Sequence, residues 1–535
     1  MTLATLGGRR TLTLAAMIFA VAMPYIDQTL VALAVPDLQR DLGLSATGTQ
    51  WIVNAYLLSL SALFLLGGKL ADIAGRRRMV VIGVVVFATA SLLCGLTPEG
   101  DLAEAWIITF RVIQGAGAAL MIPASFAIVV GAFDVSTRGR ALAAFFGITG
   151  SLTALGPLAG GYLTEWTWRS IFWVNVPFAI AALALAAVAE PADRRPPAPL
   201  DRLGALLAAA GMGLTGLGML QSSACGWSIP ASFACIAAGA AVLAAFVRYE
   251  RRPATPLVDM RMFRSRGFAA ANGVLFLTMM VFLPVFFFAS VYAQVALGED
   301  ASAAALYLVI FFGAFAAASQ LGGTIYDHHG VRVAVLPGCL VSATGFALWA
   351  WSLDDFSLGD EWIYIIMAAA GCGLILGPAT TDALNRVAAD RLGQATGINQ
   401  TMRNFGASVG LAILGTALIL QTRGNVESSL TAVGLPKERA DAIATALSRS
   451  GGGSAHPSFD EAAGPAGERI FAAVQDDFAD ATRTVFYLMA AILVATCIVS
   501  AIWLPRDRVA ARARKAVQID DTGPEPSTDP PIGVR

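Results

Sequence analysis

Fourteen apolar runs recur along the chain, and they constrain the fold more than any other feature. Each is about 17 to 25 residues long, the length at which an α-helix crosses a hydrocarbon core. Of the 535 residues, 56% are hydrophobic and only 14% are charged, and the mean hydropathy is +0.67. A soluble protein carries about a quarter charged residues, so much of this apolar surface must face lipid. The sequence therefore predicts an all-α membrane protein with spans near 12–35, 48–67, 79–97, 105–130, 141–163, 170–189, 204–222, 229–247, 268–292, 302–323, 333–352, 362–382, 395–420 and 482–504.

The first run raises one alternative, because it follows Arg9 and Arg10 and contains an A-x-A triplet at Ala32–Ala34. Those features are shared with a cleaved signal peptide. The apolar region of a signal peptide is roughly 7 to 15 residues long, whereas this run is about 24 residues long and contains Asp27. We therefore interpret it as a spanning helix.

Positive charges fall mostly on alternate connections between the predicted spans. With the N-terminus inside, 26 of the 36 Lys and Arg residues lie on the inner side and 7 on the outer side. Loops rich in Lys and Arg stay in the cytoplasm. The bias predicts a multi-pass protein of the cell inner (plasma) membrane, with both termini cytoplasmic.

An internal repeat divides the chain. The pattern Gly-Gly-x-x-x-Asp-x-x-Gly-x-Arg at 67–77 returns at 322–332, an offset of 255 residues. Both copies fall on the predicted cytoplasmic side, which is typical of parallel repeats. We expect two six-helix pseudo-repeat domains plus two inserted helices. The predicted segments are an N-terminal domain at 1–190, inserted linker helices at 191–260, a C-terminal domain at 261–505 with an outer loop at 421–480, and a disordered cytoplasmic tail at 506–535.

The first copy of the repeat, Gly67–Met79, is the densest run of charge between two apolar segments. A carboxylate at Asp72 can cap a helix N-terminus or pair with an arginine, and glycines let two helix ends approach closely. We expect a conformational latch here, formed by Gly68, Asp72, Gly75, Arg76 and Arg77. The second copy has Thr324 and Val331 in place of Lys69 and Arg76, so its latch should be weaker.

Asp27 and Arg111 are charged residues inside predicted spans, and an intramembrane charge is by default a functional hypothesis. Asp27 and Arg111 lie at similar depth below the outer ends of helices one and four. We predict that they pair and couple transport to protons; the alternative is that each only satisfies neighbouring polar groups.

Other polar and aromatic residues of the spans are candidates for a substrate cavity, with interhelical hydrogen bonds or lipid contact as the alternative. These candidates are Gln50, Asn54, Asn175, Phe286, Tyr292, Asn399 and Arg403.

Several classes of function are disfavoured by the sequence. The net charge of −1 gives no sign of nucleic-acid binding, and the six cysteines and three histidines form no CxxC motif or ligand cluster. No GxxxxGK[ST] motif is present, so no ATP site is predicted. We expect no enzymatic activity, no metal and no cofactor, and a monomer in the lipid bilayer whose partners are protons and a small-molecule substrate.

The motifs together resemble the major facilitator superfamily, in particular its fourteen-helix drug:proton antiporter branch. Gly68-x-Leu70-Ala71-Asp72-x-x-Gly75-Arg76-Arg77 is similar to the loop motif between helices two and three of that family, and Asp27-x-Thr29 followed by Ala34-x-Pro36 to its first-helix motif. Arg111-x-x-Gln114-Gly115-x-Gly117 resembles the helix-four motif linked to proton coupling. Gly156, Pro157, Gly160 and Gly161 resemble the helix-five antiporter motif, although Leu152 replaces an earlier glycine of that motif.

The resemblance implies a proton-coupled antiporter that exports lipophilic or cationic small molecules such as drugs, antibiotics or toxic metabolites by alternating access. Exporters or importers of a specific metabolite, lipid or nutrient in the same superfamily are the alternative. A proton-conducting respiratory subunit is disfavoured, because it needs mid-membrane lysines and the three lysines here are Lys69, Lys437 and Lys515.

Overall fold

The computed structural model describes most of the chain. It covers residues 3–44, 46–134, 137–154, 156, 160, 163, 166–189, 199–224, 229–252, 256–297, 301–353, 358–388, 391–432 and 467–506. Within these residues all regular structure is helical, which confirms the predicted all-α class. The middle of the predicted outer loop (433–466), the tail beyond 506 and Pro157 lie outside the described residues.

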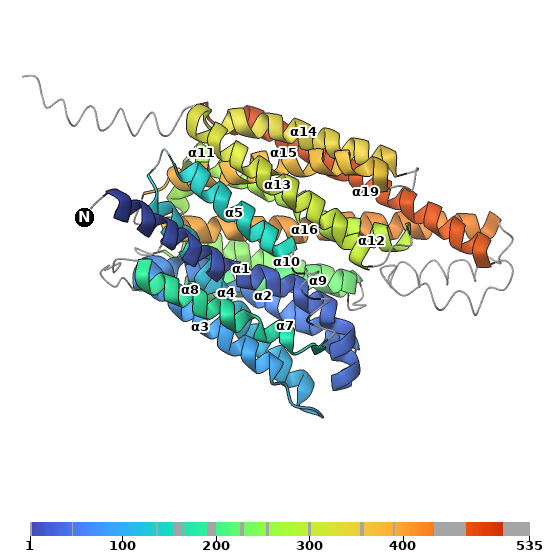
Figure 1. The fold of residues 1–535 in the computed structure, drawn as a ribbon, viewed down its shortest axis with the longest axis horizontal. Helices are drawn as coiled ribbons and strands as arrows, with labels where there is room; N and C mark the ends of the chain where they lie inside the picture. The colour runs from blue at the N-terminus through green and yellow to red at the C-terminus, as the bar shows by residue number, and fades with distance from the viewer. Residues whose placement is uncertain are drawn as a thin grey trace, which may run out of the picture.

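The helices form one elongated bundle (Figure 1). The N-terminal group comprises α1 (Leu3–Leu42), α2 (Ala46–Ala74), α3 (Arg76–Gly95), α4 (Ala103–Ala132), α5 (Arg138–Ala154), α7 (Ser170–Trp173) and α8 (Asn175–Ala189). The middle pair is α9 (Arg202–Ala224) and α10 (Ile229–Tyr249). The C-terminal group comprises the 3₁₀ helix η1 (Met260–Arg264), α11 (Arg266–Phe282), α12 (Pro284–Val295), α13 (Ala301–His329), α14 (Val331–Ser352), α15 (Leu358–Asn385), α16 (Leu392–Ala432) and α19 (Gly467–Trp503).

Thirteen helical segments of the described chain are long and apolar enough to cross a membrane. One predicted span, the fifth at 141–163, is not among these thirteen; it corresponds to α5. A spanning helix satisfies its own backbone hydrogen bonds, which lipid cannot do. The chain is therefore a multi-pass membrane protein.

Two predicted boundaries differ from the observed ones. The predicted ninth span is divided at Leu283, because Pro284 has no N–H to continue α11 and instead begins α12. α16 continues to Ala432 and α19 begins at Gly467, so both ends of the segment assigned to an outer loop are helical. The polar residues there hid these extensions from a search for apolar runs.

The two groups meet through a pair of crossings. In Figure 1, α5 lies beside α13, and contacts join α2 to α16 in the same way. Helices α9 and α10 pack on each other, and α9 also contacts α2 and α16. The inserted pair therefore touches both groups along one of the two crossings.

A glycine begins the helix after each copy of the repeated loop. Gly75 precedes α3 with φ 99°, and Gly330 precedes α14 with φ 91°. Residues other than glycine rarely adopt such backbone angles, so both copies need glycine to turn the chain at this point. We call the end of the bundle that contains Gly75 and Gly330 the motif end, and the opposite end the far end.

Replacing either turn glycine should therefore destabilise the protein. We expect Gly75→Ala and Gly330→Ala each to cost about 1–3 kcal/mol, because alanine is strained at positive φ. Gly313→Ala is the matched control, since a Cβ there meets nothing within 4 Å. Thermal unfolding of the purified proteins in detergent measures the effect; equal melting temperatures for the three variants would contradict this reading.

Candidate functional site

The buried ion pair lies within the N-terminal group. Arg111 Nη1 of α4 donates to Asp27 Oδ2 of α1 at 2.5 Å, and both residues are fully buried. The predicted contact between these two charges is therefore present. Leaving either charge unpaired in this apolar environment would cost several kcal/mol, so the two residues depend on each other.

Two amides complete the surroundings of Asp27. Gln114 Nε2 of α4 donates to Asp27 Oδ1 at 2.9 Å, and Asn175 Nδ2 of α8 donates to the same oxygen at 3.2 Å. Asn175 also donates to Ser91 Oγ of α3 at 2.9 Å. The carboxylate is thus held by side chains from two other helices, and Asn175, predicted for a substrate cavity, belongs to this polar cluster instead.

Arg111 is oriented by α2 as well as by Asp27. Its Nε donates to the carbonyl oxygen of Ile52 at 2.8 Å, and its guanidinium lies 4.4 Å from the centre of the Tyr56 ring. A Cβ at Gly115 would lie 2.5 Å from the Tyr56 carbonyl oxygen, so glycine there lets α4 approach α2 closely. Protonation of Asp27 would remove the charge that balances Arg111 and free the guanidinium to change partners.

The helix-five motif lies directly against the turn that carries Asp27. A Cβ at Gly156 would overlap the Oγ1 atom of Thr29, two residues beyond Asp27. Gly160 is buried, whereas Pro157 and Gly161 lie outside the described residues. The close approach at Gly156 brings α5, which contacts the C-terminal group, next to the ion pair.

At the motif end, Asp72 joins the two groups. Its Oδ1 and Oδ2 accept hydrogen bonds from the backbone N–H groups of Gly393 and Gln394, both at 2.7 Å. These N–H groups belong to the first turn of α16, where a helix has free donors and favours negative charge. Arg76 Nη2 lies 3.6 Å from Asp72 Oδ1, and Gly68 packs against the carbonyl of Gly393 so closely that a Cβ would overlap it. Both roles considered for Asp72, helix cap and arginine partner, are therefore observed.

The second copy makes the symmetric contact in the opposite direction. Asp327 of α13 accepts hydrogen bonds from the backbone N–H groups of Gly139 and Arg140 in the first turn of α5, at 3.1 and 3.3 Å. A Cβ at Gly323 would lie 2.6 Å from the carbonyl oxygen of Gly139. Each group of helices thus caps a helix of the other group, and the second pair of hydrogen bonds is longer.

Among the described residues, only the first copy also contacts the segment after the inserted helices. Lys69 Nζ donates to the carbonyl oxygen of Pro256 at 2.8 Å, while Thr324, at the corresponding position, donates to Gln320 of its own helix. Nearby, Asp259 pairs with Arg391 just before α16. The first latch is therefore linked to the end of the inserted pair, and the second is not.

The remaining cavity candidates are dispersed. Phe286 stacks on Phe312 with ring centres 4.6 Å apart, and Asn399 donates to Asn272 at 3.4 Å. Asn54 is partly buried, and the Gln50 side chain lies outside the described residues. Arg403 is buried at the contact between the two groups.

Tyr292 contacts a buried carboxylate, Glu361, that was not predicted from the sequence. The hydroxyl of Tyr292 and Nε1 of Trp349 each donate to Glu361, both at 3.1 Å, and Glu361 is fully buried. Tyr292 thus belongs to a polar cluster near the far end. The donors observed for buried Glu361 there are the aromatic side chains of Tyr292 and Trp349. The start of an apolar run directly after Glu361 was the available signal.

Glu250, at the end of α10, is a second buried carboxylate that sequence reasoning missed. It is 3% exposed; its Oε2 accepts from the backbone N–H of Val258 at 3.3 Å, and its charged neighbours include Lys69 and Asp201. Burial raises the pKa of the Glu250 carboxyl to about 7, and the negative charge of Asp201 adds to the rise.

The comparisons with known proteins agree with this architecture. The sequence profile of the Major Facilitator Superfamily matches residues 17–411. The multidrug resistance protein Stp of Mycobacterium tuberculosis (strain ATCC 25618 / H37Rv) is 30% identical over 93% of this chain and 92% of its own. The cephamycin export protein CmcT of Amycolatopsis lactamdurans is 34% identical over 75% of this chain and 83% of its own. The solved proton:xylose symporter XylE gives a TM-score of 0.56 at 14% identity, covering 94% of this chain and 98% of that one.

A polytopic bundle with two copies of one loop, each capping a helix of the other group, is the architecture of a secondary transporter. The chain belongs to the major facilitator superfamily.

The latch geometry predicts unequal effects of its two carboxylates. Asp72→Asn should raise the accessibility of the motif end to a water-soluble reagent about tenfold. The reason is that a hydrogen bond to a charged group contributes about 1.5 kcal/mol or more. Asp327→Asn should have a smaller effect, because its hydrogen bonds are longer. The measurement is the reaction rate of a water-soluble maleimide with a single cysteine at buried Ala395, with exposed Asp101→Asn as control. Unaltered rates in Asp72→Asn would contradict the latch.

The raised pKa of Glu250 predicts a pH-dependent stability. The folded-state pKa of about 7 lies above the ordinary value, so the stabilising contribution is complete below the ordinary value and is lost as the pH rises through 7. Glu250→Gln resembles the protonated form at every pH. Its stability relative to wild type should therefore increase by about 1–2 kcal/mol between about pH 5.5 and pH 8.5. Unfolding temperatures test this, with exposed Glu99→Gln as control; a difference that does not vary with pH would refute it.

Proposed function

We propose that the protein exports lipophilic small molecules, such as drugs, antibiotics or toxic metabolites, in exchange for protons. The observation that carries the proposal is the fully buried pair of Asp27 and Arg111. A carboxylate inside a membrane protein can take up a proton, and its partner arginine responds to the loss of charge. The relatives Stp and CmcT are named for multidrug resistance and cephamycin export, which supports the direction of transport.

The proposed cycle couples this pair to the opening of the bundle. Protonation of Asp27 frees Arg111, and the close contact between Thr29 and Gly156 transmits the change from α1 to α5. Because the first turn of α5 is capped by Asp327 of the C-terminal group, a movement of α5 strains the contacts at the motif end. Asp72 and Arg76 act as the latch that keeps this end closed and favours the outward-open state.

The proposal also assigns sidedness and domains. The motif end faces the cytoplasm of the cell's plasma membrane, and both termini lie there. Residues 1–190 and 261–505 move as the two domains, with 191–260 between them, and the protein works as a monomer. The hydrogen bonds of Asp72 and Asp327 join the two domains at the motif end, which supports alternating access by this division.

Replacing the proposed proton carrier should abolish active export. Asp27→Asn keeps the shape of the side chain but cannot exchange a proton, so we expect efflux of the fluorescent dye N-phenyl-1-naphthylamine from a pump-deficient host to fall about tenfold or more. Asp37→Asn, on the same helix and paired only with nearby Arg40 in the structure, is the matched control. Expression should be retained, whereas the melting temperature should fall because buried Arg111 loses its counter-ion; efflux is therefore compared per amount of folded protein. Undiminished efflux by Asp27→Asn would remove the basis of the proposal.

A further inference from the structure

Arg403 lies at the middle depth of the bundle, where the two groups of helices meet. It is ten residues along α16 from Gly393, whose N–H donates to Asp72, and therefore about 15 Å from the motif end. That distance is about half the thickness of a hydrocarbon core. Its side chain is only 7% exposed.

The charge of Arg403 is not balanced in this conformation. Its guanidinium lies 4.6 Å from the centre of the Phe146 ring of α5, while Nη1 has no hydrogen-bond partner and Arg403 forms no ion pair within the described part of the chain. A cation–π contact contributes about 0.5–2 kcal/mol, whereas a buried ion costs several kcal/mol. Arg111, buried at a comparable level, has Asp27 as its counter-ion. The difference indicates that something other than the described residues pairs with Arg403 during the cycle.

A second unsatisfied polar group lies one turn away on the same face of α16. Gln400 Nε2 donates to the hydroxyl of Tyr25 of α1 at 3.3 Å, but Gln400 Oε1 is buried without a partner among the described residues. Residues three apart are neighbours on a helix surface. Arg403 and Gln400 therefore offer a free donor with positive charge and a free acceptor side by side.

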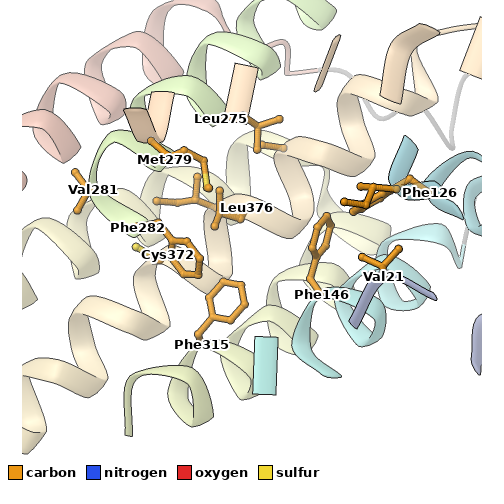
Figure 2. Close-up of a cluster of buried hydrophobic side chains, with 14 of the residues drawn as sticks. Val21, Phe126, Phe146, Leu275, Met279, Val281, Phe282, Phe315, Cys372 and Leu376 are labelled. Carbon is orange, nitrogen blue, oxygen red and sulfur yellow. The ribbon is translucent and has the colours of Figure 1, made fainter. Parts of the chain in front are cut away.

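The surroundings of this pair are aromatic and apolar. Phe146 packs against Phe126 with ring centres 5.1 Å apart, and Figure 2 shows both near Val21, at the edge of a hydrophobic cluster that extends to Phe282 and Phe315. Aromatic walls with a few convergent polar groups are typical of small-molecule sites.

We propose that Arg403 binds the anionic group of an amphipathic aromatic substrate, a carboxylate, sulfonate or phenolate, while Gln400 accepts a hydrogen bond from the same molecule. The proposal rests on the export function and narrows its substrate class. The sequence resemblance implied lipophilic or cationic cargo, whereas the unpaired charge here is positive and favours an anionic group. Arg403 and Phe146 come from opposite groups, so opening of the bundle separates them and exposes the guanidinium to a substrate that replaces the ring.

Two dyes with nearly the same skeleton test this. 1-Anilinonaphthalene-8-sulfonate carries a sulfonate that N-phenyl-1-naphthylamine lacks. Equilibrium dialysis with the purified full-length protein should show at least about tenfold weaker binding of the sulfonate dye to Arg403→Gln, as expected for loss of about 1.4 kcal/mol. Binding of the neutral dye should change less than about twofold, since the aromatic contacts stay. Arg266→Gln, which removes an exposed arginine, controls for the change in net charge.

A further variant separates charge from structure. Arg403→Lys keeps the charge but loses the planar fork, so it should bind the sulfonate dye with an intermediate affinity. If Arg403→Gln does not fold, Arg403→Lys alone is the test, and wild-type affinity of Arg403→Lys for both dyes would overturn the proposal. So would equal losses for the two dyes in a folded Arg403→Gln, or a wild type that does not bind the sulfonate dye. Because dialysis needs no proton gradient, a positive result together with normal efflux by Asp27→Asn would refute proton coupling and leave the anion site intact.

Discussion

The cost of burying charge in an apolar bundle governs the structure described here. Asp27 and Arg111 are both inaccessible to water, and each supplies the charge that balances the other, while Gln114 and Asn175 donate to Asp27. Such a pair is weak evidence for stability, because two hydrophobic residues could replace it at little cost. We therefore propose that the pair serves function rather than stability. The surrounding glycines, Gly115 and Gly156, bring α2 and α5 close enough to respond.

The same principle operates at the motif end, where carboxylates meet helix ends. Asp72 and Asp327 each accept two backbone N–H groups from a helix of the opposite group, so one repeated loop holds both crossings. The copies are unequal: Lys69 adds a contact to the segment following the inserted helices, and Thr324 does not. The first copy therefore makes the shorter hydrogen bonds and one additional contact. The buried Glu250 beside Lys69 lies where the inserted pair meets that latch.

The fold was largely predictable from the sequence, because spanning helices need long apolar runs and every predicted run corresponds to a helix. The C-terminal end of α16 and the N-terminal end of α19 were not predictable, because these parts of the helices are polar and lack a long apolar run. The contact of Asp27 with Arg111 followed from depth alone. The partner of Asp72 could not be predicted, because the hydrogen bond from the Gly393 N–H depends on how two segments distant in sequence pack. The burial of Glu361 could not be predicted for the same reason, because its donors Tyr292 and Trp349 lie on other helices.

The central claim is that the carboxylate of Asp27 couples substrate movement to proton movement. Inverted membrane vesicles, energised to hold a pH gradient, test it most directly when a dye substrate is added and the gradient is followed with a pH-sensitive fluorophore. The account predicts that wild-type vesicles accumulate the dye and lose part of the gradient, and that vesicles with Asp27→Asn do neither. Accumulation of the dye with no change in the gradient, or the same proton flux in Asp27→Asn, would contradict it.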